Sequence, residues 1–232
     1  MIEAALDCSQ GAALAICRDG VLLQELCLPG DGRDSDRLLA SWLVAQCTQL
    51  GLSLAEIERW TVGTGPGSFA GLRCGIALVK GICLSSRAAM RGVPSAYALG
   101  KNAATAAALS PGQKVGVLHD GRCGQVILSQ FRLGEDGEPA LFVPPAPQNP
   151  QDLLLPECAC DLWVALSGQR LPELPPALMQ SLRLEDYVPA AQLLTASGWP
   201  WPVTAAQEEE SCTPLYIRQA VFVRPAAVRQ VE

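Results

Sequence analysis

The chain has 232 residues, with 17 Lys and Arg against 23 Asp and Glu, so its formal net charge is −6. Only 17% of the residues are charged and 49% are apolar, which argues against intrinsic disorder and provides side chains for a sizeable core. The acidic balance argues against a protein that binds nucleic acid by itself, because such proteins cluster Lys and Arg against phosphates. The length suits one large domain or two small lobes.

The start of the chain, Met1-Ile2-Glu3-Ala4, has no basic segment, so we expect no secretory signal. Arg73 and Lys80 interrupt the longest apolar region, and we expect no segment with the roughly 18 to 20 apolar residues of a membrane span. The sequence therefore favours a soluble, cytoplasmic protein.

Cysteine and histidine limit the chemistry that this chain can perform. It has ten cysteines, none in a Cys-x-x-Cys pair, and one histidine, His119, so a mixed-ligand zinc site is not expected. Most of the cysteines lie in apolar segments, where Cys acts as a small hydrophobic residue, although a redox role stays open. A Ser-His-Asp or Cys-His site would have to use His119, which reads more simply as a strand-end residue. We assign no catalytic residue, metal or cofactor.

The first half of the chain alternates strands and helices. Strands are expected at 2–7, 11–18 and 21–28, with Asp19-Gly20 as a hairpin turn between the last two. A helix face follows, ending at Gly51, with Leu38, Leu39, Trp42, Leu43, Cys47 and Leu50. Next come a capping box at Ser53–Glu56, a strand at 60–63, a helix at 69–85, a strand near Val93 and a helix at 97–109.

The second half repeats the beginning of the first. Strands are expected at 115–119, 126–133, 141–143 and 162–166, and prolines break most of 139–214, including an exposed loop from Trp199 to Glu210. A strand ends in an aspartate and opens a hairpin at Asp7 and again at Asp120. This order predicts two related lobes, 1–110 and 111–232, with two unrelated hairpins as the alternative.

A glycine-rich turn at 63–68 opens the helix at 69–85. Its Gly65-x-Gly67-x-x-Ala70 matches a dinucleotide fingerprint, but no carboxylate ends the next strand, and the Gly-Lys-Ser/Thr of a P-loop is missing. Ser68 is more simply a helix N-cap, and anion binding at this helix start is the weaker alternative.

The same helix has glycines at every fourth position, Gly67, Gly71 and Gly75. Glycine inside a helix costs up to about 1 kcal/mol relative to alanine, so several on one side indicate a close approach of another backbone. That backbone belongs either to the chain's own sheet or to a partner helix.

The segment 65–76 resembles the signature Gly-Pro-Gly-Ser-Phe-Thr-Gly-Leu-Arg-Ile-Gly of the TsaB (YeaZ) family, bacterial proteins of tRNA threonylcarbamoyladenosine biosynthesis. The matching motif residues are Gly65, Pro66, Gly67, Ser68, Phe69 and Arg73, among others. Weaker matches to the family are Leu6-Asp7-Cys8-Ser9, Asp120-Gly121-Arg122 and Pro214-Leu215-Tyr216-Ile217-Arg218. The chain departs from the family pattern at Ala70, at Asp34-Ser35 and at Gly124-Gln125-Val126-Ile127.

The resemblance implies an α/β protein with two RNase H-like lobes of the actin/Hsp70-like (ASKHA) ATPase fold, the second lobe being reduced. It implies a non-catalytic scaffold that lacks the metal-binding histidines of the TsaD transferase. Such a scaffold pairs with TsaD, with the TsaE ATPase joining, so that a threonylcarbamoyl group reaches adenosine 37 of tRNA. Homodimers through the same helical face are also implied, and tRNA is contacted mainly through the complex.

The glycine spacing beside an apolar helix face predicts the partner interface. We expect there Leu39, Trp42, Leu43, Gly71, Leu72, Gly75, Ile76 and Val79. A bulky residue at Gly75 is expected to weaken pairing and leave the monomer folded. The alternative function is an actin-like nucleotide-binding enzyme or a peptidase-like hydrolase that uses Asp7 and Asp120.

Overall fold

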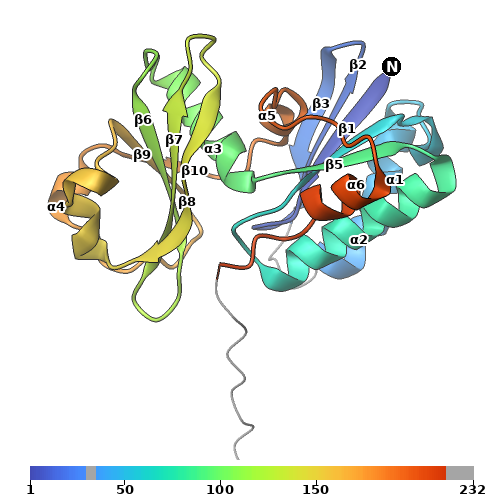
Figure 1. Ribbon diagram of the computed structural model, residues 1–232. Coiled ribbons are helices and arrows are strands. Elements are labelled where there is room, and N and C mark those ends of the chain that lie inside the picture. Colours follow the sequence, from blue (N-terminus) through green and yellow to red (C-terminus); the bar gives the residue numbers. More distant parts are fainter. Residues whose placement is uncertain (30–34, 218–232) are drawn as a thin grey trace, which may run out of the picture.

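The computed structural model describes residues 1–29 and 35–217, and these form two five-stranded mixed sheets that lie side by side (Figure 1). The first sheet has the order β3-β2-β1-β4-β5. Its strands are β1 Ile2–Asp7, β2 Ala13–Arg18, β3 Val21–Cys27, β4 Arg59–Gly63 and β5 Ala89–Val93. Strands β1 to β3 are antiparallel, whereas β4 and β5 run parallel to β1.

The second sheet repeats this arrangement in the order β8-β7-β6-β9-β10. Its strands are β6 Lys114–Asp120, β7 Val126–Leu133, β8 Pro139–Gln148, β9 Leu162–Leu166 and β10 Leu182–Glu185. Antiparallel β6, β7 and β8 correspond to β1, β2 and β3, and parallel β9 and β10 correspond to β4 and β5. The predicted α/β fold with a repeated strand order is therefore confirmed.

Helices cover the two sheets unequally. On one face of the first sheet lie α1 Ser35–Gln49, η1 Leu54–Glu56, α2 Phe69–Ser86 and α6 Ala205–Ser211. Among the described residues, the helices on the outer face of the second sheet are the short η2 Pro150–Leu154, η3 Pro156–Cys158 and α4 Pro176–Met179. The second lobe is thus the reduced one.

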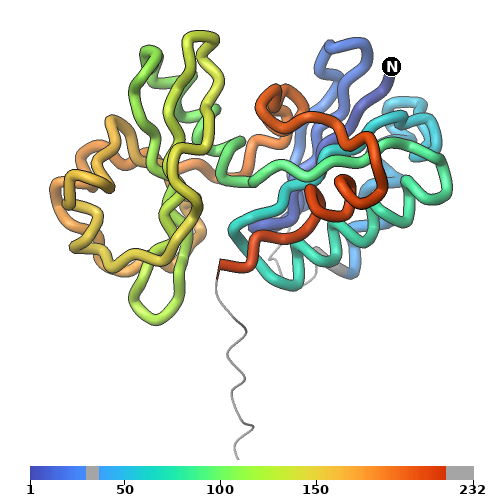
Figure 2. The backbone as a smooth tube through the Cα atoms, viewed as in Figure 1, coloured from blue at the N-terminus to red at the C-terminus, as the bar shows by residue number. Residues whose placement is uncertain are grey.

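Two helices lie between the sheets and connect the lobes. Helix α3 Ser95–Ala106 packs on β6 and β9, and α5 Ala190–Leu194 packs on β1 and β2. Figure 2 shows the chain after α5 returning along the first lobe, where α6 packs on β5. Because each half of the chain sends a helix to the other half's sheet, the boundary between residues 110 and 111 stays a prediction.

Several local signals have the expected backbone geometry. Asp19 and Gly20 both have positive φ, as a type I′ hairpin turn requires, and Gly51 has a φ of +68° where α1 ends. The Ser53–Glu56 capping box is present, and the Ser68 side chain accepts a hydrogen bond from the amide of Gly71.

Helix α2 differs from what we expected of membrane-spanning segments. Among the residues that the structure describes, it alone is long and apolar enough to cross a membrane by length and composition, with a mean hydropathy of 1.4. Its leucine, isoleucine, valine and cysteine residues raise this value, and only two basic residues strongly lower it. Its buried residues pack on β1, β4 and β5, so part of its apolar surface belongs to the core.

Candidate functional site

The glycine-rich turn lies against the end of β1 and encloses Asp7. The carboxylate of this buried residue accepts hydrogen bonds from the backbone N–H of Ser9 (2.8 Å), from the Ser9 hydroxyl (2.6 Å) and from the Ser95 hydroxyl. The Ser95 oxygen in turn accepts a bond from the amide of Gly65 (2.9 Å). Asp7 therefore connects β1, the glycine-rich turn and the start of α3.

This enclosure leaves Asp7 no access to a ligand. It is 1% exposed, and a Cβ atom at Gly63 would lie 1.8 Å from its Oδ2. Burial raises the pKa of the Asp7 carboxyl, and the bonds from Ser9 and Ser95 oppose that rise. The geometry favours a structural role over Mg²⁺ or nucleotide binding.

Asp120 occupies the equivalent place at the end of β6. Its Oδ1 accepts a bond from the backbone N–H of Arg122 (2.8 Å), two residues on, just as Asp7 accepts one from Ser9. Its Oδ2 forms an ion pair with the Arg122 guanidinium (3.2 Å). Each aspartate thus stabilises the turn that follows its own strand.

His119 is buried inside β6, with 4% of its surface exposed. Within residues 1–29 and 35–217, neither ring nitrogen has a hydrogen-bond partner, and burial lowers the pKa of His119 to about 4. A neutral imidazole without contact to solvent or to a nucleophile is not placed to act as a general base.

The glycine face of α2 packs on the chain's own β1–β2 turn. A Cβ atom at Gly67 would lie 2.4 Å from the Ser9 carbonyl oxygen, and one at Gly71 would lie 2.3 Å from that of Cys8. One at Gly75 would lie 2.7 Å from the Cys8 sulfur. Of the two readings of this spacing, the structure therefore supports close packing within the chain, and a bulky side chain at Gly75 would meet Cys8 before any partner.

The residues that we predicted at a partner interface lie mostly inside the first lobe. Six are buried, namely Leu39, Leu43, Gly71, Leu72, Gly75 and Val79. Trp42 and Ile76 are partly buried and pack against the same core. The exposed large apolar side chains of α1 and α2 are others: Leu38, Val44, Phe69 and Leu84.

The two family motifs meet at the start of α2. The Arg73 guanidinium lies 3.8 Å from the centre of the Phe69 ring, and its Nε donates a hydrogen bond to the Tyr216 hydroxyl (2.6 Å). The Phe69 and Tyr216 ring centres are 5.1 Å apart. Nothing in the sequence predicted this contact, because the two motifs are far apart in the chain. Asp34 and Arg218, which we compared with family positions, lie outside the described residues.

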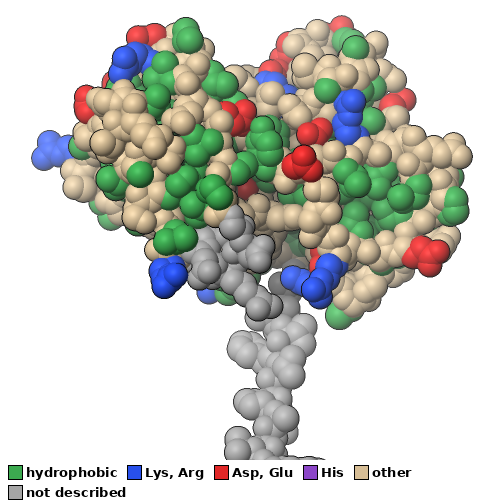
Figure 3. All heavy atoms as spheres, turned by 180° about the vertical axis from the view of Figure 1, so that it is seen from behind, with side chains coloured by type: hydrophobic (Ala, Val, Ile, Leu, Met, Phe, Trp, Pro, Cys, Tyr) green, Lys and Arg blue, Asp and Glu red, His purple; other side chains and the backbone are tan. Residues whose placement is uncertain are grey.

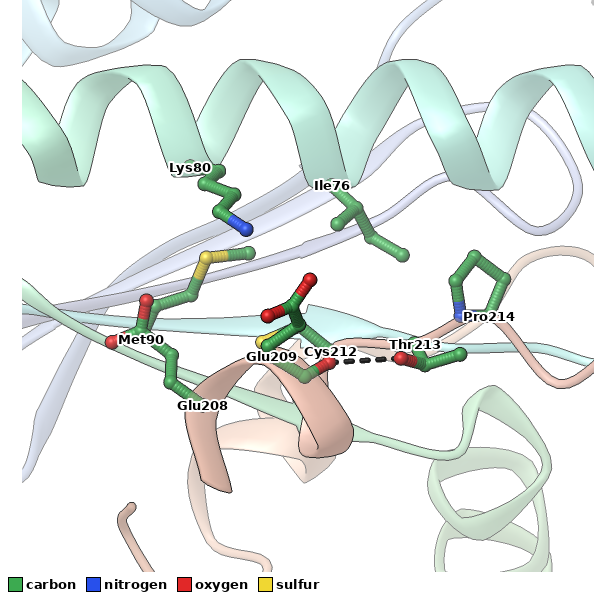
Figure 4. Close-up of a pocket in the computed structure, with 8 residues that line it drawn as sticks. All are labelled: Ile76, Lys80, Met90, Glu208, Glu209, Cys212, Thr213 and Pro214. Atoms are coloured by element: carbon green, nitrogen blue, oxygen red, sulfur yellow. Dashed lines mark hydrogen bonds between the residues drawn. The ribbon is translucent and has the colours of Figure 1, made fainter. Parts of the chain in front are cut away.

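A small pocket of about 180 Å³ lies between α2 and α6 (Figure 4). Ile76 and Lys80 point from α2 toward Glu209 and Cys212 of the C-terminal segment. Burial raises the pKa of the Cys212 thiol, so this thiol stays protonated at neutral pH. Among the described residues that line this pocket, no hydrogen bond joins the Cys212 thiol to the side chains of Lys80, Glu208 or Glu209.

Two sequence comparisons relate this chain to known proteins. Residues 32–142 match the family model described as TsaD, tRNA N6-adenosine threonylcarbamoyltransferase. The tRNA threonylcarbamoyladenosine biosynthesis protein TsaB of Escherichia coli is 28% identical over 136 residues, which are 56% of this chain and 54% of that protein. The aligned region thus spans about half the length of this curated relative.

Solved structures extend the likeness to nearly the whole chain. YeaZ from Pseudomonas aeruginosa superposes with a TM-score of 0.68 and 22% identity, covering 93% of this chain and 99% of that one. A second Pseudomonas aeruginosa structure, of a protein with similarity to peptidase YeaZ, gives a TM-score of 0.69 and 22% identity, with coverages of 94% and 99%. In sequence the chain is thus similar to TsaB, and in fold it is similar to YeaZ. The superposition shows that this chain has the fold of YeaZ, and the two expected lobes with a repeated strand order are present.

Proposed function

We propose that this protein is a non-catalytic scaffold subunit in tRNA threonylcarbamoyladenosine biosynthesis. It pairs in the cytoplasm with a TsaD-like transferase, and a TsaE-like ATPase joins them, for transfer of a threonylcarbamoyl group to adenosine 37 of tRNA. The relatedness to TsaB and the partial match to the transferase family model support this role. The enclosure of Asp7 is the observation that supports a non-catalytic role. It puts out of reach the carboxylate that an actin-like enzyme would use to bind a magnesium nucleotide.

The pairing surface that we propose is the outer side of α1 and α2. These helices pack against each other and bury their inner sides on the first sheet. Their outer sides expose Val44 (51%), Phe69 (50%) and Leu84 (78%). Several large apolar side chains exposed on neighbouring helices are typical of a protein interaction site. The buried residues that the sequence analysis predicted at the interface pack beneath these helices and hold them on the first sheet.

Copurification tests this surface. Charge on the outer side, as in the double variant Val44→Glu with Leu84→Glu, is expected to reduce recovery of the TsaD-like transferase at least tenfold. Leu154→Glu with Met179→Glu is the matched control, because these residues of the second lobe, in η2 and α4, are 52% and 55% exposed. Recovery of the transferase equal to wild type with the double variant would contradict the proposed surface.

The same double variant also tests whether the chain forms a homodimer. If copies of this chain pair through the outer side of α1 and α2, the double variant will be monomeric by analytical ultracentrifugation at concentrations where the wild type dimerises. Competition between homodimer and heterodimer then follows, because both use one surface.

A further inference from the structure

Two basic residues face each other on the second sheet. Lys114 of β6 and Arg132 of β7 are direct cross-strand partners. Like charges in this position destabilise an antiparallel pair unless another group compensates. That group is Phe142 of β8: its ring centre lies 4.0 Å from the Arg132 guanidinium carbon and 4.9 Å from the Lys114 ammonium nitrogen. We call these three residues the Phe142 surface.

The two cations are available for an external anion. Within the described ranges, neither side chain forms an ion pair with a carboxylate. Asp161 directly precedes β9 and lies beside the first residue of β6, but its carboxylate accepts bonds from the backbone N–H of Lys114 (2.7 Å) and from the Gln113 side chain (3.3 Å). Phe142 is 42% exposed, so the Phe142 surface is open to solvent.

The edge position of β8 limits which partner can bind. β8 is the last strand of its sheet, and its sequence Pro-Ala-Leu-Phe-Val-Pro-Pro-Ala-Pro-Gln contains four prolines. Proline lacks the N–H that an added strand would need, so pairing of a partner strand with this edge is disfavoured. Figure 3, which views the molecule from behind, shows that hydrophobic side chains also reach the surface of both lobes.

We propose that the Phe142 surface binds RNA, namely the tRNA of the proposed complex. A guanidinium stacked on a ring keeps its N–H groups at the edge, where they can donate to phosphate. Cations beside an exposed aromatic ring on a β-sheet are a recurrent arrangement for single-stranded RNA. The net charge of −6 agrees with a supporting contact within a complex, because two cations alone give weak affinity.

The inference rests on the proposed function, and the test separates the two. The complex of the full chain with its transferase is titrated with a fluorescein-labelled tRNA transcript containing adenosine 37, from 50 to 200 mM KCl. Lys114→Gln with Arg132→Gln is expected to weaken binding about tenfold. The slope of log K against log [KCl] should become shallower by about 0.7 for each cation removed. Phe142→Leu is expected to weaken binding with the salt dependence unchanged. Arg18→Gln with Arg87→Gln, on exposed residues of the first lobe, is the charge-matched control.

The possible outcomes separate the Phe142 surface from the proposed function. Wild-type affinity in the Lys114/Arg132 variant, or an equal loss in the control, overturns the Phe142 surface and leaves the proposed function intact. Loss of transferase association in place of tRNA binding also overturns it, and indicates an acidic protein partner. If the wild-type chain forms no complex with the transferase, the proposed function fails. In that case the free chain is titrated with the same tRNA at 50 mM KCl. Equal affinity of the wild type and the Lys114/Arg132 variant would overturn the Phe142 surface.

Discussion

Gly71 of α2 lies so close to Cys8 that a Cβ atom at position 71 would stand 2.3 Å from the Cys8 carbonyl oxygen. Two backbones can approach this closely only where one has no side chain. The family signature on α2 is therefore first a packing motif, which holds the helix on the β1–β2 turn and positions its outer side.

Gly71→Ala is expected to destabilise the fold by about 2 kcal/mol or more, because the methyl group cannot fit beside the Cys8 backbone. The measurement is the midpoint of urea unfolding. Gly81→Ala is the control in the same helix, where a Cβ would meet nothing within 4 Å, and it should stabilise by up to about 1 kcal/mol. Equal effects of the two substitutions would rule out the close contact.

Arg91 connects the C-terminal segment to the first sheet. Its guanidinium donates to the carbonyl oxygens of Leu194 (3.0 Å), Ala196 (3.1 Å) and Trp199 (2.6 Å), and it stacks on Trp201 at 4.5 Å. These bonds tie the end of α5 and the residues that follow it to β5.

Arg91→Lys removes this branched set of donors and is expected to destabilise the protein by about 3 kcal/mol. Hydrogen exchange should become faster in residues 190–201. Arg18→Lys, at an exposed position, is the control and should change neither quantity. Protection of 190–201 equal to wild type in Arg91→Lys would show that other contacts hold this segment.

His119 predicts a dependence of stability on pH. Its pKa is lowered to about 4 in the folded protein, against 6.5 for an ordinary histidine, so between these values the unfolded chain binds more protons. The contribution of His119 is fully present above pH 6.5 and is lost as the pH falls toward 4, by about 3 kcal/mol.

Urea unfolding at several pH values measures this effect, with His119→Leu as the comparison. Between pH 6.5 and 4 the variant should lose less stability than the wild type. Parallel curves for the two proteins would mean that His119 gains a proton without cost.

Asp7 predicts the result of a nucleotide titration. Its carboxylate is occupied by Ser9 and Ser95 and closed over by Gly63, so we expect no micromolar binding of Mg-ATP to the purified chain. Isothermal titration calorimetry is the measurement. Micromolar binding that Asp7→Ala abolishes would instead favour the nucleotide-binding enzyme.

Helix α1 illustrates the limit of periodicity. Of the face that we predicted, Leu39, Leu43 and Cys47 are buried, but Leu38 is 41% exposed. A 3.6-residue period cannot separate a core position from its neighbour on the helix surface when both are leucine. The direction of the apolar face therefore became certain only with the sheet in place.

The region rich in proline shows a different limit. Strand β9 was expected from its apolar run, but β10 and α5 were not, because they are too short to show a period. Helix α6 lies where an exposed loop was expected from Trp199 to Glu210, and the capping box of Thr204 and Gln207 at its start is the local signal that indicates it. The positions of these elements depend on contacts with distant residues, such as Arg91 with the end of α5.

By itself, the sequence determined the repeated strand order, the hairpin turn at Asp19-Gly20, the helix caps and the glycine signature, because each is a local pattern of backbone preference or side-chain period. Only the tertiary structure decided that the glycines of α2 contact Cys8 and Ser9, that Asp7 is enclosed, and that Lys114, Arg132 and Phe142 form one surface. These contacts join residues separated by many positions in the chain. The sequence around a glycine or a charged residue does not predict which distant residue it contacts, because the packing of the sheets and helices determines that contact.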